Sequence, residues 1–290
     1  MNFNKISNSL KASLFATVAV LLFSNCQPDE FDSGNGLSDP AVDASFTILP
    51  VEGAPNKFVL RMDGKNVLSN KWDIGKGAFS GSESQEVFLA DAGTYTIGHT
   101  VTGRGGLKNT MTQELVVATS DPAAGNMIKG SKFLNAEDHA QWTVLHISGT
   151  ATNWTFNEGS ATIKGGSSAQ QGIYQAIQVE ANKKYTLDMK VWGSGATNTW
   201  FEVYVSPTAP TQNSDYSAGG KRIALNTWAG CGNTPFNGFL STVGCGGDNL
   251  GPVVQFPTSG TVYFVIKSGG DNLGETGISI TDVEFRGSSI

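Results

Sequence analysis

The sequence has few charged residues, only three cysteines and no apolar run of membrane-spanning length. Charged side chains make up 15% of the 290 residues and give a formal net charge of −6. Binding a nucleic-acid backbone normally requires a basic face, so this charge balance argues against nucleic acid and favours a neutral partner. The apolar run Leu14–Phe23 is too short to span a bilayer comfortably and has the size of a signal-peptide core.

Recognisable catalytic motifs are also missing. The chain has no paired acidic motif like the E-x-D-x-x-E of sandwich-fold glucanases, no Arg/His/Tyr set of the alginate-lyase kind and no G-x-S-x-G elbow. His139 and His146 have no obvious partner. Several carboxylates could in principle furnish a glycosidase pair: Glu158, Asp188, Glu202, Asp215, Asp248, Asp271 and Glu275. We therefore expect a protein that is not an enzyme, with a secreted glycoside hydrolase or lyase as the alternative.

Glycine is abundant. It accounts for 36 of the 290 residues, well above the usual share of about 7%. This composition suits many short strands joined by tight turns rather than long helices. A chain of this length has room for one large or two ordinary domains, each with a real core.

The N-terminus has the features of an export signal. Lys5 and Lys11 precede the apolar run, and Cys26 follows it closely. This arrangement resembles a bacterial lipoprotein signal, which implies a signal peptide over residues 1–25 and lipidation of Cys26. Cleavage by an ordinary signal peptidase is the alternative.

Residues 26–40 are polar, acidic and rich in turn formers, so we expect a flexible tether there. The stretch also resembles the acidic signal that sends Bacteroidetes lipoproteins to the outer face of the outer membrane. The resemblance implies a protein that faces the cell exterior and touches the membrane through its lipid anchor only.

The other two cysteines are expected to pair. If Cys26 carries lipid, Cys231 and Cys245 remain as an even pair in an oxidising compartment, where a disulfide is the default. The bond would close a polar, glycine-rich loop, which also holds Phe236 and Phe239. These two phenylalanines are expected to form a small local core, or alternatively the wall of a ligand cleft. A metal site is a weak alternative because neither a third cysteine nor a nearby histidine completes a ligand set.

Residues 41–118 alternate apolar and polar side chains in short runs punctuated by Gly, Asp and Asn, the pattern of a small antiparallel sandwich. The stretch "KWDIGKG" (Lys71–Gly77), followed by "FLADAGTYTIGHTVTGRGG", resembles the PKD domain, an immunoglobulin-like fold. The resemblance implies a spacer domain with Trp72 in its core and Tyr95 packed on a strand. No ligand is expected there.

Residues 119–126 are small and polar and are expected to be a linker. Residues 127–290 again contain many strand-like runs, which suggests a jelly roll of two packed sheets. The expected fold class is therefore all-β, with an Ig-like sandwich followed by a jelly-roll β-sandwich.

The second region resembles the β-sandwich carbohydrate-binding modules in its opening segment (Asn126–Phe133), in Trp142 and in its final strand (Asp282–Phe285). Such modules often hold a structural Ca²⁺ between the opening segment and the last strand. The carboxylates in the corresponding places are Glu137, Asp138 and Asp282. Solvated surface acids are the alternative interpretation of these residues.

Strand parity predicts which side chains face the core. In "KKYTLDMKVWG" (Lys183–Gly193) the apolar face consists of Tyr185, Leu187, Met189 and Val191. Lys190 and Trp192 then lie on the opposite face. Trp142 and Trp154 are expected to be core residues.

The same parity applies to two later runs. In "WFEVYVS" (Trp200–Ser206) the non-core face carries Trp200, Glu202 and Tyr204, and in "RIALNTW" (Arg222–Trp228) it carries Asn226 and Trp228. Three neighbouring runs would each place a tryptophan among polar residues, and exposed aromatic clusters usually mark binding sites. Core packing of each tryptophan is the alternative.

Aromatic and polar side chains together suit a sugar. A pyranose offers an apolar C–H face to an indole or phenol ring, and its hydroxyls need planar donors and acceptors. The predicted ligand-binding residues are Trp192, Trp200, Trp228, Tyr204, Glu202, Asn226, Lys190, Asn198 and Asp215.

The sequence thus predicts a lipid-anchored surface protein that binds a polysaccharide without cleaving it, with a neutral β-glucan such as laminarin as the first guess. Mannan or xylan would fit the same residues. The architecture resembles the accessory glycan-binding lipoproteins of Sus-like uptake systems, which implies an outer-membrane glycan transporter, a glycanase and associated lipoproteins as partners. A surface adhesin is the remaining alternative.

Overall fold

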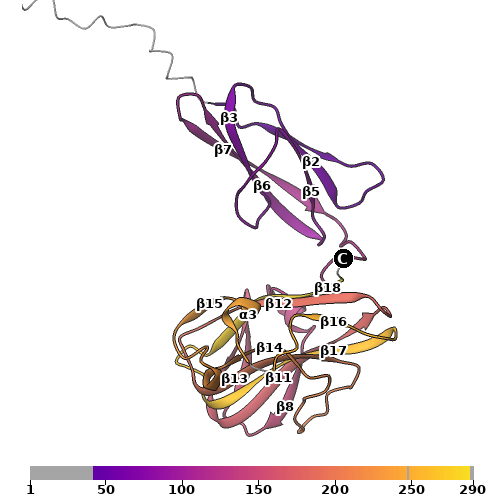
Figure 1. Ribbon diagram of the computed structural model, residues 1–290, viewed down its shortest axis with the longest axis vertical. Helices are drawn as coiled ribbons and strands as arrows, with labels where there is room; N and C mark the ends of the chain where they lie inside the picture. Colours follow the sequence, from indigo (N-terminus) through magenta and orange to yellow (C-terminus); the bar gives the residue numbers. More distant parts are fainter. Residues whose placement is uncertain (1–41, 247, 288–290) are drawn as a thin grey trace, which may run out of the picture. The chain divides into compact units, whose positions relative to one another are not determined.

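The computed structural model describes residues 42–246 and 248–287 of the chain. Almost all regular structure in this part is β-strand (Figure 1). The predicted Cys26 lipidation site and the tether lie outside the described residues. No helix within the described ranges is both long and apolar enough to cross a membrane.

The chain divides into two compact units. The first comprises the residues up to Ile48 together with Leu60–Gln85 and Thr96–Gln113. The second comprises Leu49–Val59, Glu86–Tyr95 and all residues from Glu114 onward. The strands from Thr143 to the C-terminus therefore belong entirely to the second unit.

Two sheets form from the strands that precede residue 118. One has the order β1-β2-β5 and the other the order β4-β3-β6-β7. Their bounds are β1 Phe46–Pro50, β2 Lys57–Met62, β3 Val67–Asp73, β4 Phe79–Ser80, β5 Ser84–Phe88, β6 Gly93–Gly103 and β7 Lys108–Val117.

An aromatic cluster fills the core of the first unit. Trp72 is fully buried, as the sequence predicts, and its ring stacks on His99 with centroids 4.0 Å apart. Phe46 meets both rings edge-on. His99 is also fully buried, and its Nδ1 lies 2.9 Å from the carbonyl oxygen of Ala44. If the His99 ring were protonated, its positive charge would therefore be buried away from water.

His99 is expected to make folding sensitive to acid. Burial lowers the pKa of His99 below its usual 6.5, although the Ala44 hydrogen bond and the charges of Asp43 and Asp63 act in the opposite direction. Below pH 6.5 His99 is therefore protonated more readily in the unfolded chain than in the folded chain. The contribution of neutral His99 to the free energy of unfolding is fully present above pH 6.5 and decreases as the pH falls below it. Urea denaturation at pH 5, 6, 7 and 8 measures this slope.

The matched variant for that test is His99→Gln, which cannot titrate. It should be less stable than wild type at pH 8, because the ring stack is lost, yet lose less stability between pH 8 and pH 5. Equal slopes for the two proteins would show that His99 is not the group responsible.

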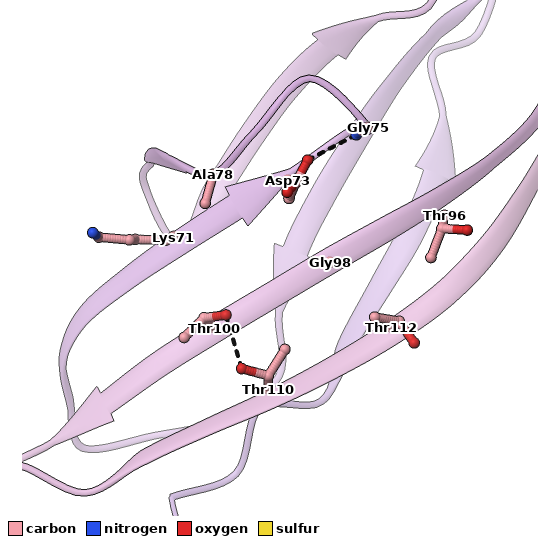
Figure 2. A pocket seen from close by; sticks show the side chains of 9 residues that line it. All are labelled: Lys71, Asp73, Gly75, Ala78, Thr96, Gly98, Thr100, Thr110 and Thr112. Carbon is pink, nitrogen blue, oxygen red and sulfur yellow. Dashed lines mark hydrogen bonds between the residues drawn. The ribbon is translucent and has the colours of Figure 1, made fainter.

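The outer face of the β4-β3-β6-β7 sheet has a shallow hollow (Figure 2). Gly98 on β6 lacks a side chain, and the space beside it is bordered by Lys71, Asp73 and a set of threonines. The Asp73 carboxylate accepts from the backbone N–H of Gly75, and the hydroxyls of Thr100 and Thr110 are 2.9 Å apart. The lining contains no aromatic ring, so the hollow offers a sugar no stacking surface.

The strands from Thr143 onward form two larger sheets. A six-stranded sheet has the order β15-β12-β18-β10-β9, with β16 also paired to β12, and a five-stranded sheet has the order β14-β13-β17-β11-β8. Figure 1 shows β12 and β18 in one layer and β13, β17, β11 and β8 in the other. The bounds are β8 Thr143–Ser148, β9 Asn153–Asn157, β10 Ser160–Lys164, β11 Gly166–Val179, β12 Lys184–Gly193, β13 Thr197–Ser206, β14 Lys221–Asn226, β15 Phe236–Phe239, β16 Val253–Gln255, β17 Gly260–Asn272 and β18 Ile278–Gly287.

From residue 119 onward, helical structure in the part of the chain that the structure describes is limited to single turns. They are α2 (Ala136–His139), the 3₁₀ turn Thr227–Ala229 and α3 (Leu240–Val243). The predicted all-β class, with a jelly-roll-like sandwich at its C-terminal end, is confirmed.

One hydrophobic core lies between the two sheets. The six-stranded sheet contributes Tyr185, Leu187 and Phe285, and the five-stranded sheet contributes Phe201, Phe264 and Ile266, all at most 2% exposed. The parity prediction for β12 is correct, since Tyr185, Leu187, Met189 and Val191 all point into this core. Trp142 and Trp154 are buried too, as expected.

Candidate functional site

The loop 207–220, here called the strap, crosses the outer face of the five-stranded sheet from β13 to the edge strand β8. At β8 the backbone N–H of Asn213 donates to the carbonyl of His146 (2.7 Å). The Gln212 side chain accepts from the N–H of His146 and donates to the carbonyl of Val144, both at 2.9 Å. The strap thus pairs with an edge that would otherwise lack a partner strand.

A small second core lies under the strap. Tyr216 packs edge-on against Tyr204 with centroids 6.0 Å apart. Leu145 and Ile147 from β8 and Val265 from β17 complete the buried part of the cluster. Tyr204 is only 6% exposed. It therefore lies on the predicted face, but the strap covers it.

Beyond the strap, a row of residues crosses the exposed part of the sheet. Gly269 on β17 pairs with Trp200 on one side and with Gln170 on the other. A Cβ at Gly269 would lie 3.0 Å from Trp200 Cζ2 and 2.7 Å from Gln170 Cγ. Both side chains therefore lean over the glycine, and the partly exposed indole lies close against the sheet.

A polar row runs beside this one. Asn198 on β13 donates to the Asp271 carboxylate (3.0 Å), and the Ser168 hydroxyl donates to its other oxygen (3.0 Å). All three are exposed. These hydrogen bonds lower the pKa of Asp271 and keep it an acceptor. We call the two rows together, Trp200, Gly269, Gln170, Asn198, Asp271 and Ser168, the open face.

A charged row separates the open face from the strap. Lys267 on β17 is 4% exposed, and its Nζ lies 2.6 Å from Asp215 Oδ1 and 3.7 Å from Glu202 Oε2. Lys221 on β14 bridges Asp248 (2.6 Å) and Glu202 (3.5 Å). Each ammonium group thus has two carboxylate neighbours, and Glu202 lies between the two.

The charged row also fixes the aromatic residues around it. Lys267 Nζ lies 4.9 Å from the Trp200 ring centroid and 5.0 Å from that of Tyr204, within cation–π range. The Tyr204 hydroxyl donates to Glu202 (2.8 Å). The pKa of Tyr204 is raised, mainly by burial of its hydroxyl and secondly by the nearby charge of Glu202. Burial alone would raise the pKa of Asp215, but the hydrogen bond and charge of Lys267 lower it overall.

The β14 edge of the open face carries the most exposed aromatic residue of the site. Asn226 pairs with Trp200, and its side-chain oxygen accepts from the backbone N–H groups of Trp228 and Ala229, which caps the 3₁₀ turn. Trp228 is 62% exposed. The parity prediction extended the strand to Trp228 and is wrong at this residue, because β14 ends at Asn226 and Trp228 lies in the 3₁₀ turn.

The predicted disulfide between Cys231 and Cys245 is present. Cys231 Sγ lies 3.5 Å and Cys245 Sγ 3.6 Å from the carbonyl oxygen of Asn226. The bond therefore lies directly against the residue that caps the Trp228 turn. The expected small local core of the two loop phenylalanines is wrong. Phe236 packs against the main core between the sheets, whereas Phe239 is 52% exposed because it points outward from β15.

The structure brings together most of the predicted ligand-binding residues. Trp200, Glu202, Tyr204, Asn198, Asn226 and Asp215 belong to the outer side of the five-stranded sheet or its strap, with Trp228 at the edge. The expectation of a single platform is wrong for Trp192 and Lys190, because β12 belongs to the other sheet. Outer faces of two packed sheets point in opposite directions.

Sequence reasoning missed Lys267, Gly269 and Gln170. Lys267 had a usable signal, since a lone lysine directly after the apolar run in "TVYFVIK" (Thr261–Lys267) indicates the outward side of the strand. Gly269 and Gln170 gave none, because their importance depends on register between β17 and β11.

The predicted calcium ligands come from two separate elements of the C-terminal sandwich region. Glu137 and Asp138 lie in α2 and Asp282 in β18, and the Asp138 carboxylate accepts from the N–H of Leu134 (2.8 Å). No group of three or more His, Cys, Asp or Glu side chains in residues 42–246 and 248–287 is placed to hold a metal. Calcium binding stays a prediction.

No family model and no curated protein matches this sequence. Among solved structures, carbohydrate-binding modules from the β-sandwich superfamily match with 15% identity and a TM-score of 0.32, over 86% of this chain and 99% of theirs. A CBM4 structure matches with 16% identity and a TM-score of 0.35, over 56% and 99%. The enzymatically active domain of tailspike protein 4 from Bacteriophage CBA120 matches with 14% identity and a TM-score of 0.37, over 60% and 23%. Likeness at this level assigns no ligand to this chain.

Proposed function

We propose that this chain binds a polysaccharide at the cell surface without cleaving it, and that the open face is its binding site. The observation that carries the proposal is the Trp200 indole held over Gly269, between a polar row and a charged row. An apolar ring flanked by amide, hydroxyl and carboxylate groups is what the C–H face and hydroxyls of a sugar require.

The charges near Trp200 favour a neutral glycan. Glu202, Asp215 and Asp248 outnumber Lys221 and Lys267, and both lysines are already in ion pairs. A uronate or sulfate would therefore meet a local excess of negative charge. Laminarin, a neutral β-glucan, is our first choice, and mannan or xylan would meet the same chemistry.

The rows of the open face favour a ligand that lies across the strands. The strap covers the sheet on one side of these rows, and five strands spaced about 4.8 Å apart give a row of roughly 19 Å from β14 to β8. This length accommodates several sugar units, so an internal stretch of a chain fits as well as its end.

The state of the carboxylates supports binding rather than hydrolysis. A glycosidase needs one carboxyl group that is protonated and one that is free to attack or to activate water. Glu202 and Asp215 both contact lysine ammonium groups, and Lys267 lowers the pKa of Asp215. A carboxyl group whose pKa is lowered in this way is unsuited to act as the general acid, so Asp215 does not meet that requirement.

We place this activity at the outer membrane. By the resemblance of the N-terminal residues, Cys26 carries the lipid anchor and residues 26–40 form the tether. The captured glycan then passes to a glycanase and a glycan transporter. Several membrane-anchored copies of the protein would then bind one polysaccharide, and their weak individual affinities would combine through avidity.

Affinity electrophoresis tests the proposal. The protein from Gln27 onward, which omits only the predicted signal and the lipidated cysteine, is run through gels containing laminarin, mixed-linkage glucan, xylan, mannan or alginate. Retardation by a neutral polysaccharide without release of reducing sugar is expected. A folded protein that no gel retards would favour the adhesin, and sugar release would favour the enzyme.

A further inference from the structure

The predicted residues Trp192 and Lys190 lie on the outer face of the six-stranded sheet, on the far side of the sandwich core from the open face. We propose that Trp192 and Phe239 form a second sugar-binding surface there. This inference rests on the proposed function, and it assigns two binding surfaces to one sandwich.

The Trp192 side chain is partly exposed on the surface of the six-stranded sheet. It lies next to last on β12, opposite Asn237 of β15 and Ser279 of β18. It is partly exposed and belongs to neither hydrophobic cluster of the sandwich, although Val191 beside it is fully buried. A large indole on the solvent side of a strand has no packing requirement there.

Phe239 provides a second ring on the same face. It is 52% exposed and lies directly opposite Lys190, which is also exposed. Phe239 and Trp192 are therefore diagonal neighbours across β15 and β12, and diagonal neighbours lie about 7–8 Å apart, within reach of aromatic side chains. Two rings at this separation can contact neighbouring units of one glycan.

Hydrogen-bonding groups continue the Trp192 row across the sheet. Ser279 itself is buried, and its hydroxyl lies 2.8 Å from that of the half-buried Thr162 on β10, the next residue of the row. Asn157 donates to Thr162 from β9 (3.2 Å). On the other side of Trp192, the Asn237 amide is exposed. The row of Asn, Trp, Ser and Thr repeats the mixture of ring and polar groups found on the open face.

The composition of this surface favours a sugar over a protein partner. A stable protein interface buries about 800 Å² on each side around an apolar centre. Here the apolar groups are two separate rings, and the neighbouring side chains are hydroxyls, an amide and the Lys190 ammonium group. A neutral polysaccharide, which carries hydroxyls at every unit, is the occupant that these groups satisfy.

Two surfaces on opposite sides of a sandwich cannot be bridged by one short oligosaccharide. Each must therefore take its own stretch of glycan, which gives two binding events per protein. On a long polysaccharide the two events would link chains, or distant parts of one chain, and raise the avidity.

Calorimetric titration with hexasaccharides of laminarin, xylan and mannan counts these events. Wild type is expected to bind two equivalents of at least one hexasaccharide. The double variant Trp192→Ala/Phe239→Ala should bind one equivalent with the remaining affinity unchanged, whereas Trp200→Ala should weaken the open-face event and leave the other unchanged. Val253→Ala, which removes an exposed apolar side chain from β16 of the same sheet, is the matched control and should bind two.

The outcomes separate the two proposals. One equivalent in wild type, unaffected in Trp192→Ala/Phe239→Ala, would refute the second surface and leave the proposed function standing. No binding of any hexasaccharide or polysaccharide by folded wild type would refute both. The single variants Phe239→Ala and Trp192→Phe distinguish loss of binding from loss of fold, since Phe239 is exposed and phenylalanine keeps a ring at position 192.

Discussion

Replacing Trp200 with alanine is expected to weaken binding at the open face roughly thirtyfold, because a tryptophan at the centre of a binding surface typically contributes about 2 kcal/mol or more. The indole is the apolar element between the Asn198–Asp271 row and the Glu202–Lys267 row. Without it the polar groups remain, but the C–H face of the sugar loses its stacking partner. Titration with the retarding polysaccharide, or its hexasaccharide, measures the change.

Two controls sharpen this experiment. Trp200→Phe keeps a ring over Gly269 and should lose less affinity than Trp200→Ala. Circular dichroism and urea denaturation must show that both variants fold, since Lys267 lies 4.9 Å from the ring and contacts it. Wild-type affinity in a folded Trp200→Ala protein would remove the open face from the proposed function.

Strand parity predicted correctly which side chains leave the core but not which sheet they belong to. Trp192 and Trp200 are separated by one short turn, and both point outward, as predicted. The chain nevertheless crosses from the six-stranded to the five-stranded sheet between them. Alternation has a period of two and carries no information about pairing partners, so the separation of the two tryptophans depends on long-range register.

Capping and glycine signals in the sequence would have placed Trp228 in a helical turn rather than on a strand. Asn226 is a typical N-cap residue, and Gly230 has φ of +95°, a left-handed conformation that glycine adopts easily. A cap residue followed four positions later by such a glycine marks a single helical turn. The strand therefore ends before Trp228, and Trp228 belongs to the 3₁₀ turn that immediately precedes the disulfide-closed loop.

Removing the disulfide with Cys231→Ser/Cys245→Ser is expected to lower the free energy of unfolding by about 3 kcal/mol, the value for a loop of this length. We also expect binding at the open face to weaken by about threefold to tenfold, because ordering a freed side chain or loop costs ~0.5–1.5 kcal/mol. Urea denaturation measures the first change and titration the second.

The second effect follows from the position of the bond. Both sulfurs contact the Asn226 carbonyl oxygen, and Asn226 pairs with Trp200 while its side chain caps the Trp228 turn. Freeing the loop would thus loosen the edge of the open face but not its centre, so the loss should be smaller than for Trp200→Ala. Reduction of the wild-type protein is a clean control, because the chain from Gln27 onward holds no other cysteine. A disulfide-free protein that is less stable yet binds with full affinity would show that the bond serves folding alone and that Trp228 is positioned by its cap.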